Sequence, residues 1–280
     1  MKALIQAARR DMLEYEAYAS DICEQRFLTM LEAFREQQVS TSCFAQSTGY
    51  GFNDEGRDKL ESIYARVFGC ESALCRQQIV SGSHAISLAL FGNLLPGDEL
   101  LTVGLPYDTM QTVMGINHAT PGSLTELGVN CRVLDVNFQP LDPMEVVQAL
   151  GPRTKMVEIQ RSRGYSLRHS LTVSEIGTLA HAIKAARPEI IVFCDNCYGE
   201  FVQTEEPPMQ GVDLIAGSLI KNPGAGLAPG GGYVCGRKDL VERAAVRLTV
   251  PGAGRELGAS LNLSVRIHNR RLEPGPRRGF

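Results

Sequence analysis

The stretch between Ile190 and Gly236 constrains this 280-residue chain most strongly. It begins with a short apolar run that leads directly into Asp195, and a second apolar run, 214–220, leads into Lys221. Short apolar runs bounded by turn residues are typical of buried strands. Open α/β sheets place ligand-binding groups just beyond the carboxyl ends of such strands. We therefore expect the Asp195 carboxylate and the Lys221 amine to lie near each other at one edge of a sheet.

Lys221 is the only charged side chain between Asp213 and Arg237. Removal from water disfavours an ammonium ion, so such a lysine is suited to carry a neutral amine that forms Schiff bases. Pyridoxal 5'-phosphate needs an amine for its aldehyde and an acid for its pyridinium nitrogen. The alternative is an ordinary surface lysine and a turn aspartate. The pair, together with a phosphate-binding loop upstream, favours the cofactor.

The rest of the chain alternates between predicted helices and strands. Helical patterns cover residues 2–38, 58–68, 85–95, 143–150, 173–186 and 238–248, and strand patterns cover 73–80, 99–103, 131–136, 155–160 and 233–235. This alternation predicts an α/β fold with a mostly parallel sheet and helices on both faces. We divide the chain into an N-terminal helical segment (1–45), a cofactor-binding large domain (46–250) and the start of a C-terminal region (251–280). The Arg-rich tail of that region is predicted to be disordered.

The tetrapeptide Ser81-Gly82-Ser83-His84 joins a predicted strand to a predicted helix. The exposed N–H groups and the dipole of a helix N-terminus attract phosphate, and Gly82 lets a phosphate approach the backbone. The Ser218 hydroxyl, three residues before Lys221, is a further candidate phosphate ligand. His84 has two open interpretations, packing over a cofactor ring or capping the helix.

Aromatic and basic side chains complete the predicted site. Tyr107 offers a planar face for stacking on an aromatic ring, and Tyr198 is a candidate hydrogen-bond partner for the cofactor's phenolic oxygen. Arg161 and Arg163 begin a loop after another predicted strand and are candidates for binding a substrate carboxylate. The alternatives for these residues are a half-buried loop tyrosine, solvated charges or subunit contacts.

Composition excludes several other classes of function. A formal charge of −3 gives no broad electrostatic case for binding nucleic acid. No apolar run is long enough to span a bilayer, and the N-terminus lacks the apolar core of a secretory signal, so we expect a cytoplasmic protein. Cys194 and Cys197 form a C-x-x-C pair, but no second pair lies at zinc spacing. We predict no metal site.

Several motifs occur in a fixed order along the chain, at 48–57, 81–84, 106–109, 160–165, 195–201, 217–223 and 251–260. Together they resemble the fold-type I pyridoxal-phosphate enzymes of the Cys/Met-metabolism class. Within that class they resemble the methionine gamma-lyase-like, or aluminium-resistance, proteins. The resemblance covers about residues 10–260.

The resemblance implies a Schiff base on Lys221, a salt bridge from Asp195 to the pyridine nitrogen, and ring stacking by Tyr107. It implies phosphate binding by Gly82, Ser83 and Ser218, which are the motif residues around the predicted loop.

The same resemblance implies a carbon–sulfur lyase acting on a sulfur-containing amino acid such as cystathionine, methionine or cysteine. The reaction is α-proton abstraction followed by β- or γ-elimination. Members of the class are homodimers or homotetramers that share residues between subunits, and Tyr50 and Arg57 are our candidates for that exchange.

The chain departs from the family at its end, because the match fades after Ser260. We expect a C-terminally truncated protein in which the small C-terminal domain is largely missing. One alternative is therefore an inactive cofactor-domain fragment that acts as a binding or assembly partner. Others are another fold-type I reaction, such as an aminotransferase or aldolase, and a nucleotide-binding α/β protein without a Schiff base.

Overall fold

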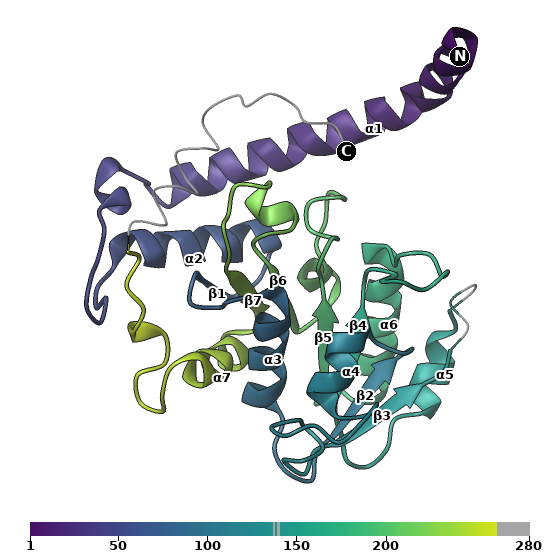
Figure 1. Ribbon diagram of the computed structural model, residues 1–280, viewed down its shortest axis with the longest axis vertical. Helices are drawn as coiled ribbons and strands as arrows, with labels where there is room; N and C mark the ends of the chain where they lie inside the picture. The colour runs from purple at the N-terminus through teal and green to yellow at the C-terminus, as the bar shows by residue number, and fades with distance from the viewer. Residues whose placement is uncertain (137, 139–140, 262–280) are drawn as a thin grey trace.

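A computed structural model of the chain describes residues 1–136, 138 and 141–261 (Figure 1). The described part is built on a seven-stranded sheet with the order β1-β7-β6-β5-β4-β2-β3. The strands are β1 (Ser72–Arg76), β2 (Glu99–Val103), β3 (Asn130–Leu134), β4 (Thr154–Gln160), β5 (Ile191–Asp195), β6 (Leu214–Ser218) and β7 (Gly232–Gly236).

All neighbouring strands are parallel except β7, which is antiparallel to both β1 and β6. The prediction of a mostly parallel sheet is confirmed. The exception arises because the chain between β6 and β7 forms only a short 3-10 helix (Asn222–Gly224) and no crossover helix. A parallel neighbour requires a crossover, so β7 returns in the opposite direction.

Helices cover both faces of the sheet, as predicted. On one face lie α2 (Glu55–Phe68), α5 (Pro143–Gln148) and α6 (Val173–Ala186), and on the other α3 (Gly82–Asn93), α4 (Asp108–Met114) and α7 (Lys238–Leu248). Each face has its own apolar core. Every residue of β1, β2, β5, β6 and β7 is buried, because both of their faces are covered.

Helix ends follow local capping rather than the apolar pattern. The predicted helix 58–68 begins three residues earlier, because the Asp54 side chain accepts a hydrogen bond from the Arg57 backbone N–H (2.9 Å). It ends where predicted, at Gly69 in the left-handed conformation (φ 65°). The predicted strand 73–80 ends at Arg76, and the residues after it lead to α3.

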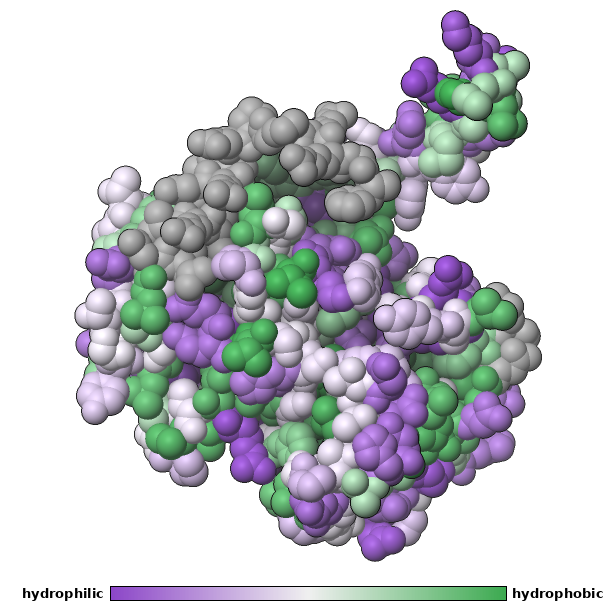
Figure 2. All heavy atoms as spheres, in the orientation of Figure 1, coloured by the Kyte–Doolittle hydropathy of each residue, from purple (hydrophilic) through white to green (hydrophobic). Residues whose placement is uncertain are grey.

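The N-terminal helix α1 (Lys2–Glu36) has 35 residues, and its first part projects from the body of the molecule (Figure 1). Hydrophilic and hydrophobic side chains are mixed on that projecting part (Figure 2). Its C-terminal part packs Ala33 against Ile63 and Val67 of α2. No helix in the described ranges combines the length and apolar character that crossing a membrane requires.

Residues 255–259, in the predicted C-terminal region, are hydrogen-bonded to the end of β1 and the residue after it. Arg76 donates hydrogen bonds to the carbonyl oxygens of Arg255 (2.8 Å) and Leu257 (3.0 Å), and the Gln77 side chain donates to that of Ala259 (2.9 Å). The tail that the sequence predicts to be disordered, 262–280, lies outside the described residues.

Candidate functional site

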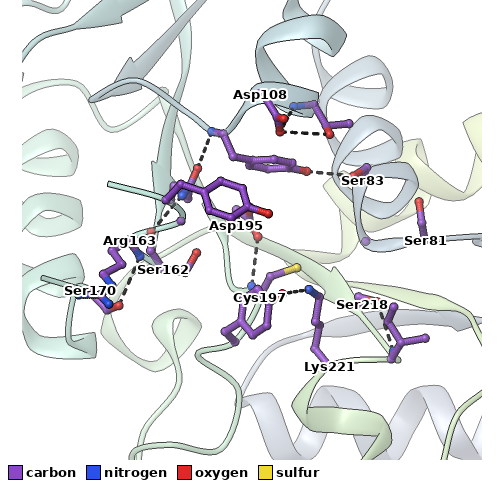
Figure 3. A pocket seen from close by; sticks show the side chains of 18 residues that line it. Ser81, Ser83, Asp108, Ser162, Arg163, Ser170, Asp195, Cys197, Ser218 and Lys221 are labelled. Carbon is purple, nitrogen blue, oxygen red and sulfur yellow. Dashed lines mark hydrogen bonds between the residues drawn. The ribbon is translucent and has the colours of Figure 1, made fainter. Parts of the chain in front are cut away.

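A cavity of about 580 Å³ opens at the carboxyl ends of β4, β5 and β6, facing the N-termini of α3 and α4 (Figure 3). Its lining includes Lys221 and Asp195, which the sequence predicts to lie near each other at this sheet edge. Parallel strands bring their carboxyl ends to one edge, so residues far apart in the sequence meet here.

Lys221 follows β6 and is half-buried at the cavity wall. Its Nζ lies 3.6 Å from the centre of the Tyr198 ring and contacts the Tyr198 hydroxyl. The amine and the phenol are therefore close enough to exchange a proton.

Asp195 is the last residue of β5 and is only 4% exposed. Its Oδ1 accepts a hydrogen bond from the Cys197 backbone N–H (3.1 Å). Burial raises the pKa of Asp195 to about 6, although this hydrogen bond and the positive charge of Lys221 act in the opposite direction. A positive charge in the cavity would stabilise the ionised carboxylate, and a pyridinium ring would supply such a charge.

The predicted phosphate loop forms the N-terminus of α3. Ser81 caps the helix by accepting a hydrogen bond from the His84 N–H (3.1 Å), and the Ser83 hydroxyl contacts the Tyr107 hydroxyl (3.0 Å). Gly82 packs so closely that an added Cβ would lie 2.9 Å from the Ser218 Cβ. Free helix N–H groups, serine hydroxyls and a glycine fit a phosphate group.

Tyr107 and His84 differ in their relation to the cavity. Tyr107 lines it, and its backbone N–H is held by the Gln160 side chain (3.0 Å). Burial raises the pKa of Tyr107, so its phenol remains protonated at neutral pH. His84 is not among the lining residues; its Nδ1 accepts a hydrogen bond from the Val80 N–H (3.2 Å), which favours the structural interpretation.

The four predicted substrate or intersubunit residues are dispersed. Arg163 lines the cavity, whereas Arg161 is 2% exposed and turns away from it to pair with Glu206 (3.4 Å). Tyr50 is 73% exposed outside the cavity lining, and buried Arg57 donates to the Gly51 carbonyl (2.6 Å). The structure thus opposes a substrate contact for Arg161, and an intersubunit role for Tyr50 and Arg57 stays a prediction.

Two buried glutamates near the site are absent from the sequence-based candidates. Burial raises the pKa of Glu158 and of Glu200 to about 8, and the nearby Asp195 charge contributes to both increases. Glu158 pairs with Phe193 across β4 and β5, two residues before the pair Gln160 and Asp195, and side chains two residues apart in a strand share a face. The Glu158 side chain therefore lies on the same face of the sheet as Asp195. The sequence signal for Glu158 was a glutamate between the apolar residues Val157 and Ile159 of β4.

Replacing Glu158 with glutamine is expected to change how stability depends on pH. Folded Glu158 stays protonated up to pH about 8, while in the unfolded chain it ionises near its ordinary value of 4.5. The contribution of Glu158 to the free energy of unfolding is therefore complete below its pKa in the unfolded chain. That contribution falls by about 1.4 kcal/mol per pH unit as pH rises toward its pKa in the folded protein. Urea unfolding between about pH 5 and about pH 7 should show that the free energy of unfolding falls less steeply with pH in the variant than in the wild type. Parallel curves for both proteins would contradict this.

Comparison with known proteins relates the whole described chain to one family. The family model for methionine gamma-lyase matches residues 1–270. A candidate cystathionine beta-lyase involved in aluminium resistance from Listeria monocytogenes has a crystal structure that is 45% identical, with a TM-score of 0.93 over 96% of this chain and 69% of that chain. The pyridoxal-5'-phosphate-dependent protein YhfS from Escherichia coli, 18% identical with a TM-score of 0.66 over 89% of this chain and 63% of YhfS, shares the fold.

The uncharacterized protein YnbB of Bacillus subtilis is 46% identical over 264 residues, which are 93% of this chain. The matched region spans 63% of the length of YnbB, so this chain corresponds to somewhat under two thirds of that relative. The family model, this identity and the fold agree with the resemblance that the motifs indicate. The chain belongs to the methionine gamma-lyase family.

Proposed function

We propose that the cavity binds pyridoxal phosphate and that the protein is a carbon–sulfur lyase acting on a sulfur-containing amino acid. The observation that carries the proposal is the arrangement of Lys221 and Asp195 around one cavity, with the Gly82 helix N-terminus at its side. Family membership supports the same class of reaction.

Each group has a distinct role in this proposal. When bound, the cofactor withdraws electrons from the amino acid's α-carbon and so acidifies its C–H bond. Asp195 holds a proton at the pyridine nitrogen, and Lys221 takes the α-proton on its Nζ. The Tyr198 hydroxyl beside that Nζ orients it and can share the proton. Tyr107 packs against the ring.

Substrate recognition falls to the rim of the cavity. Arg163 is exposed there and lies beside Ser162 and Ser170 in the lining. Its planar guanidinium matches a carboxylate, so we assign it to the substrate. We also propose a homodimer or homotetramer as the active form, with Tyr50 and Arg57 close to a neighbouring subunit.

The activity is tested by supplying the purified protein with pyridoxal phosphate and then with cystathionine, methionine or cysteine. Release of pyruvate or 2-oxobutyrate together with a thiol is the expected result, and the identity of the keto acid distinguishes β- from γ-elimination. Cofactor binding without any product would contradict the lyase while leaving the cofactor site intact. Transfer of the amino group without thiol release would indicate an aminotransferase.

Replacing Gly82 with alanine is expected to weaken cofactor binding. The added Cβ would crowd the Ser218 Cβ (2.9 Å) and the Cys197 Sγ (3.3 Å) at the phosphate end of the site. Overpacking typically costs about 1–3 kcal/mol, which corresponds to an increase in Kd of about fivefold to about 150-fold. Absorbance titration with pyridoxal phosphate measures this change. Gly230→Ala is the matched control, because a Cβ there meets no atom within 4 Å, and an equal loss in both variants would contradict the phosphate assignment.

A further inference from the structure

The segment 196–203, which follows Asp195, has a strained backbone. Tyr198 and Phe201 both adopt left-handed conformations, with φ of 69° and 64°. Bulky residues rarely adopt this conformation, which persists only where the surroundings impose it. The strain places the Tyr198 ring over the Lys221 amine. The contacts that fix this segment therefore determine the position of the Tyr198 side chain.

The Glu206 carboxylate holds the segment 196–203 through hydrogen bonds. Its side chain is completely buried, and it accepts hydrogen bonds from the Phe201 backbone N–H (2.9 Å) and the Asn196 Nδ2 (3.2 Å). One carboxylate thus ties together the residue after Asp195 and one of the two strained residues. Charged acceptors make stronger hydrogen bonds than neutral ones.

The Arg161 guanidinium also holds the segment 196–203 through hydrogen bonds. Its guanidinium donates to the Asn196 Oδ1 (2.7 Å) and the Gln203 Oε1 (3.0 Å) and lies 3.4 Å from the Glu206 carboxylate. Gly199 packs directly on this guanidinium, and a Cβ at that position would overlap it. This contact requires a glycine at position 199, because a larger side chain would collide with the Arg161 guanidinium.

Arg26 brings helix α1 into the same network. Its Nη2 pairs with the Glu206 Oε1 (2.7 Å), and its Nε donates to the Gln203 carbonyl oxygen (2.7 Å). The Arg26 side chain is only 7% exposed, so the pair is shielded from water. Breaking a buried pair by removing one partner leaves an uncompensated charge. Arg161 pairs with Glu206 at the longer distance of 3.4 Å, so removal of Arg26 would leave the Glu206 charge only partly compensated. Full compensation of that charge therefore depends on α1 being docked.

We propose that Glu206 is a positioning residue that holds Tyr198 at the Lys221 amine, and that Arg26 makes this hold conditional on the docking of α1. The helix that projects from the body thereby controls the geometry of a site it does not line. The consequence for catalysis rests on the proposed function, whereas the positioning itself concerns the protein without cofactor.

Hydrogen exchange of the cofactor-free protein tests the positioning. Arg26→Met and Glu206→Gln are expected to increase exchange of the amides in 196–203 by about tenfold or more, because local opening governs their protection. The amides of β5 should keep their rates. Arg26→Lys retains the charge but loses the planar Nε donor, so it should restore part of the protection.

A matched control separates positioning from general destabilisation. Arg132→Met removes an ion pair with Glu99 (2.9 Å) at the far side of the sheet and should leave the 196–203 rates unchanged. In the loaded protein, Arg26→Met should also shift the pH dependence of the cofactor's absorbance, whereas Arg132→Met should not. Exchange in 196–203 within about twofold of wild type in Arg26→Met would overturn the proposal. If Glu206→Gln fails to fold, the comparison of Arg26→Met with Arg26→Lys decides.

Discussion

Replacing Lys221 with alanine is expected to reduce keto acid release by about 10⁴-fold or more. The substitution removes the cavity amine that lies against the Tyr198 ring, and with it both the covalent attachment of the cofactor and the base for the α-proton. General base catalysis alone contributes about 10²–10⁴-fold, and loss of the nucleophile adds to that. Initial rates of keto acid release with excess substrate and cofactor measure the effect.

Lys155→Ala is the control for this prediction, because Lys155 is exposed at the other end of β4. It should keep the wild-type rate. The role assigned to Lys221 fails if its alanine variant retains a rate within about tenfold of wild type, since neither base catalysis nor covalent binding would then depend on it.

Asp195→Asn is expected to lower kcat by about 10²–10³-fold, as does removal of a single preorganised electrostatic group in other enzymes. Asparagine preserves the shape of the side chain, but it has no negative charge with which to stabilise a proton on the pyridine nitrogen. Steady-state kinetics with a measured content of bound cofactor separates this effect from weaker binding. A wild-type kcat in the asparagine variant would contradict the assignment.

The same substitution is expected to stabilise the cofactor-free protein near neutral pH. The pKa of folded Asp195 is raised to about 6 from an ordinary value of 3.8. The protonated Asp195 carboxyl therefore contributes stability below its pKa in the unfolded chain, and this contribution is lost as pH rises through its pKa in the folded protein. A shift of this size corresponds to at most about 3 kcal/mol. Urea unfolding at about pH 7 should show a gain, and a loss would mean that Asp195 is already charged and paired without cofactor.

The sequence could indicate which residues meet at one cavity because strand ends are visible in the apolar pattern. Asp195 and Lys221 each follow a short apolar run, and Gly82 joins a strand to a helix, so the topology of a parallel sheet brings all three together. These predictions depend on backbone topology, which the pattern specifies well.

Side-chain direction in loops was less predictable. Arg161 and Arg163 are two residues apart, and only the fold shows that one pairs with Glu206 while the other lines the cavity. The antiparallel direction of β7 was also missed, because it depends on the lack of a crossover helix between β6 and β7 rather than on any residue of β7. Glu206 itself gives no sequence signal for its role, since its partners lie on α1, at the position after β4 and in the 196–203 segment.

Borohydride reduction of the protein loaded with pyridoxal phosphate, followed by peptide mass analysis, tests the central claim most directly. Reduction converts an imine into a stable secondary amine, so we expect a pyridoxyl adduct on the peptide that contains Lys221 and no such adduct in Lys221→Ala. A protein that remains colourless with the cofactor, or an adduct on a different lysine, would contradict the account.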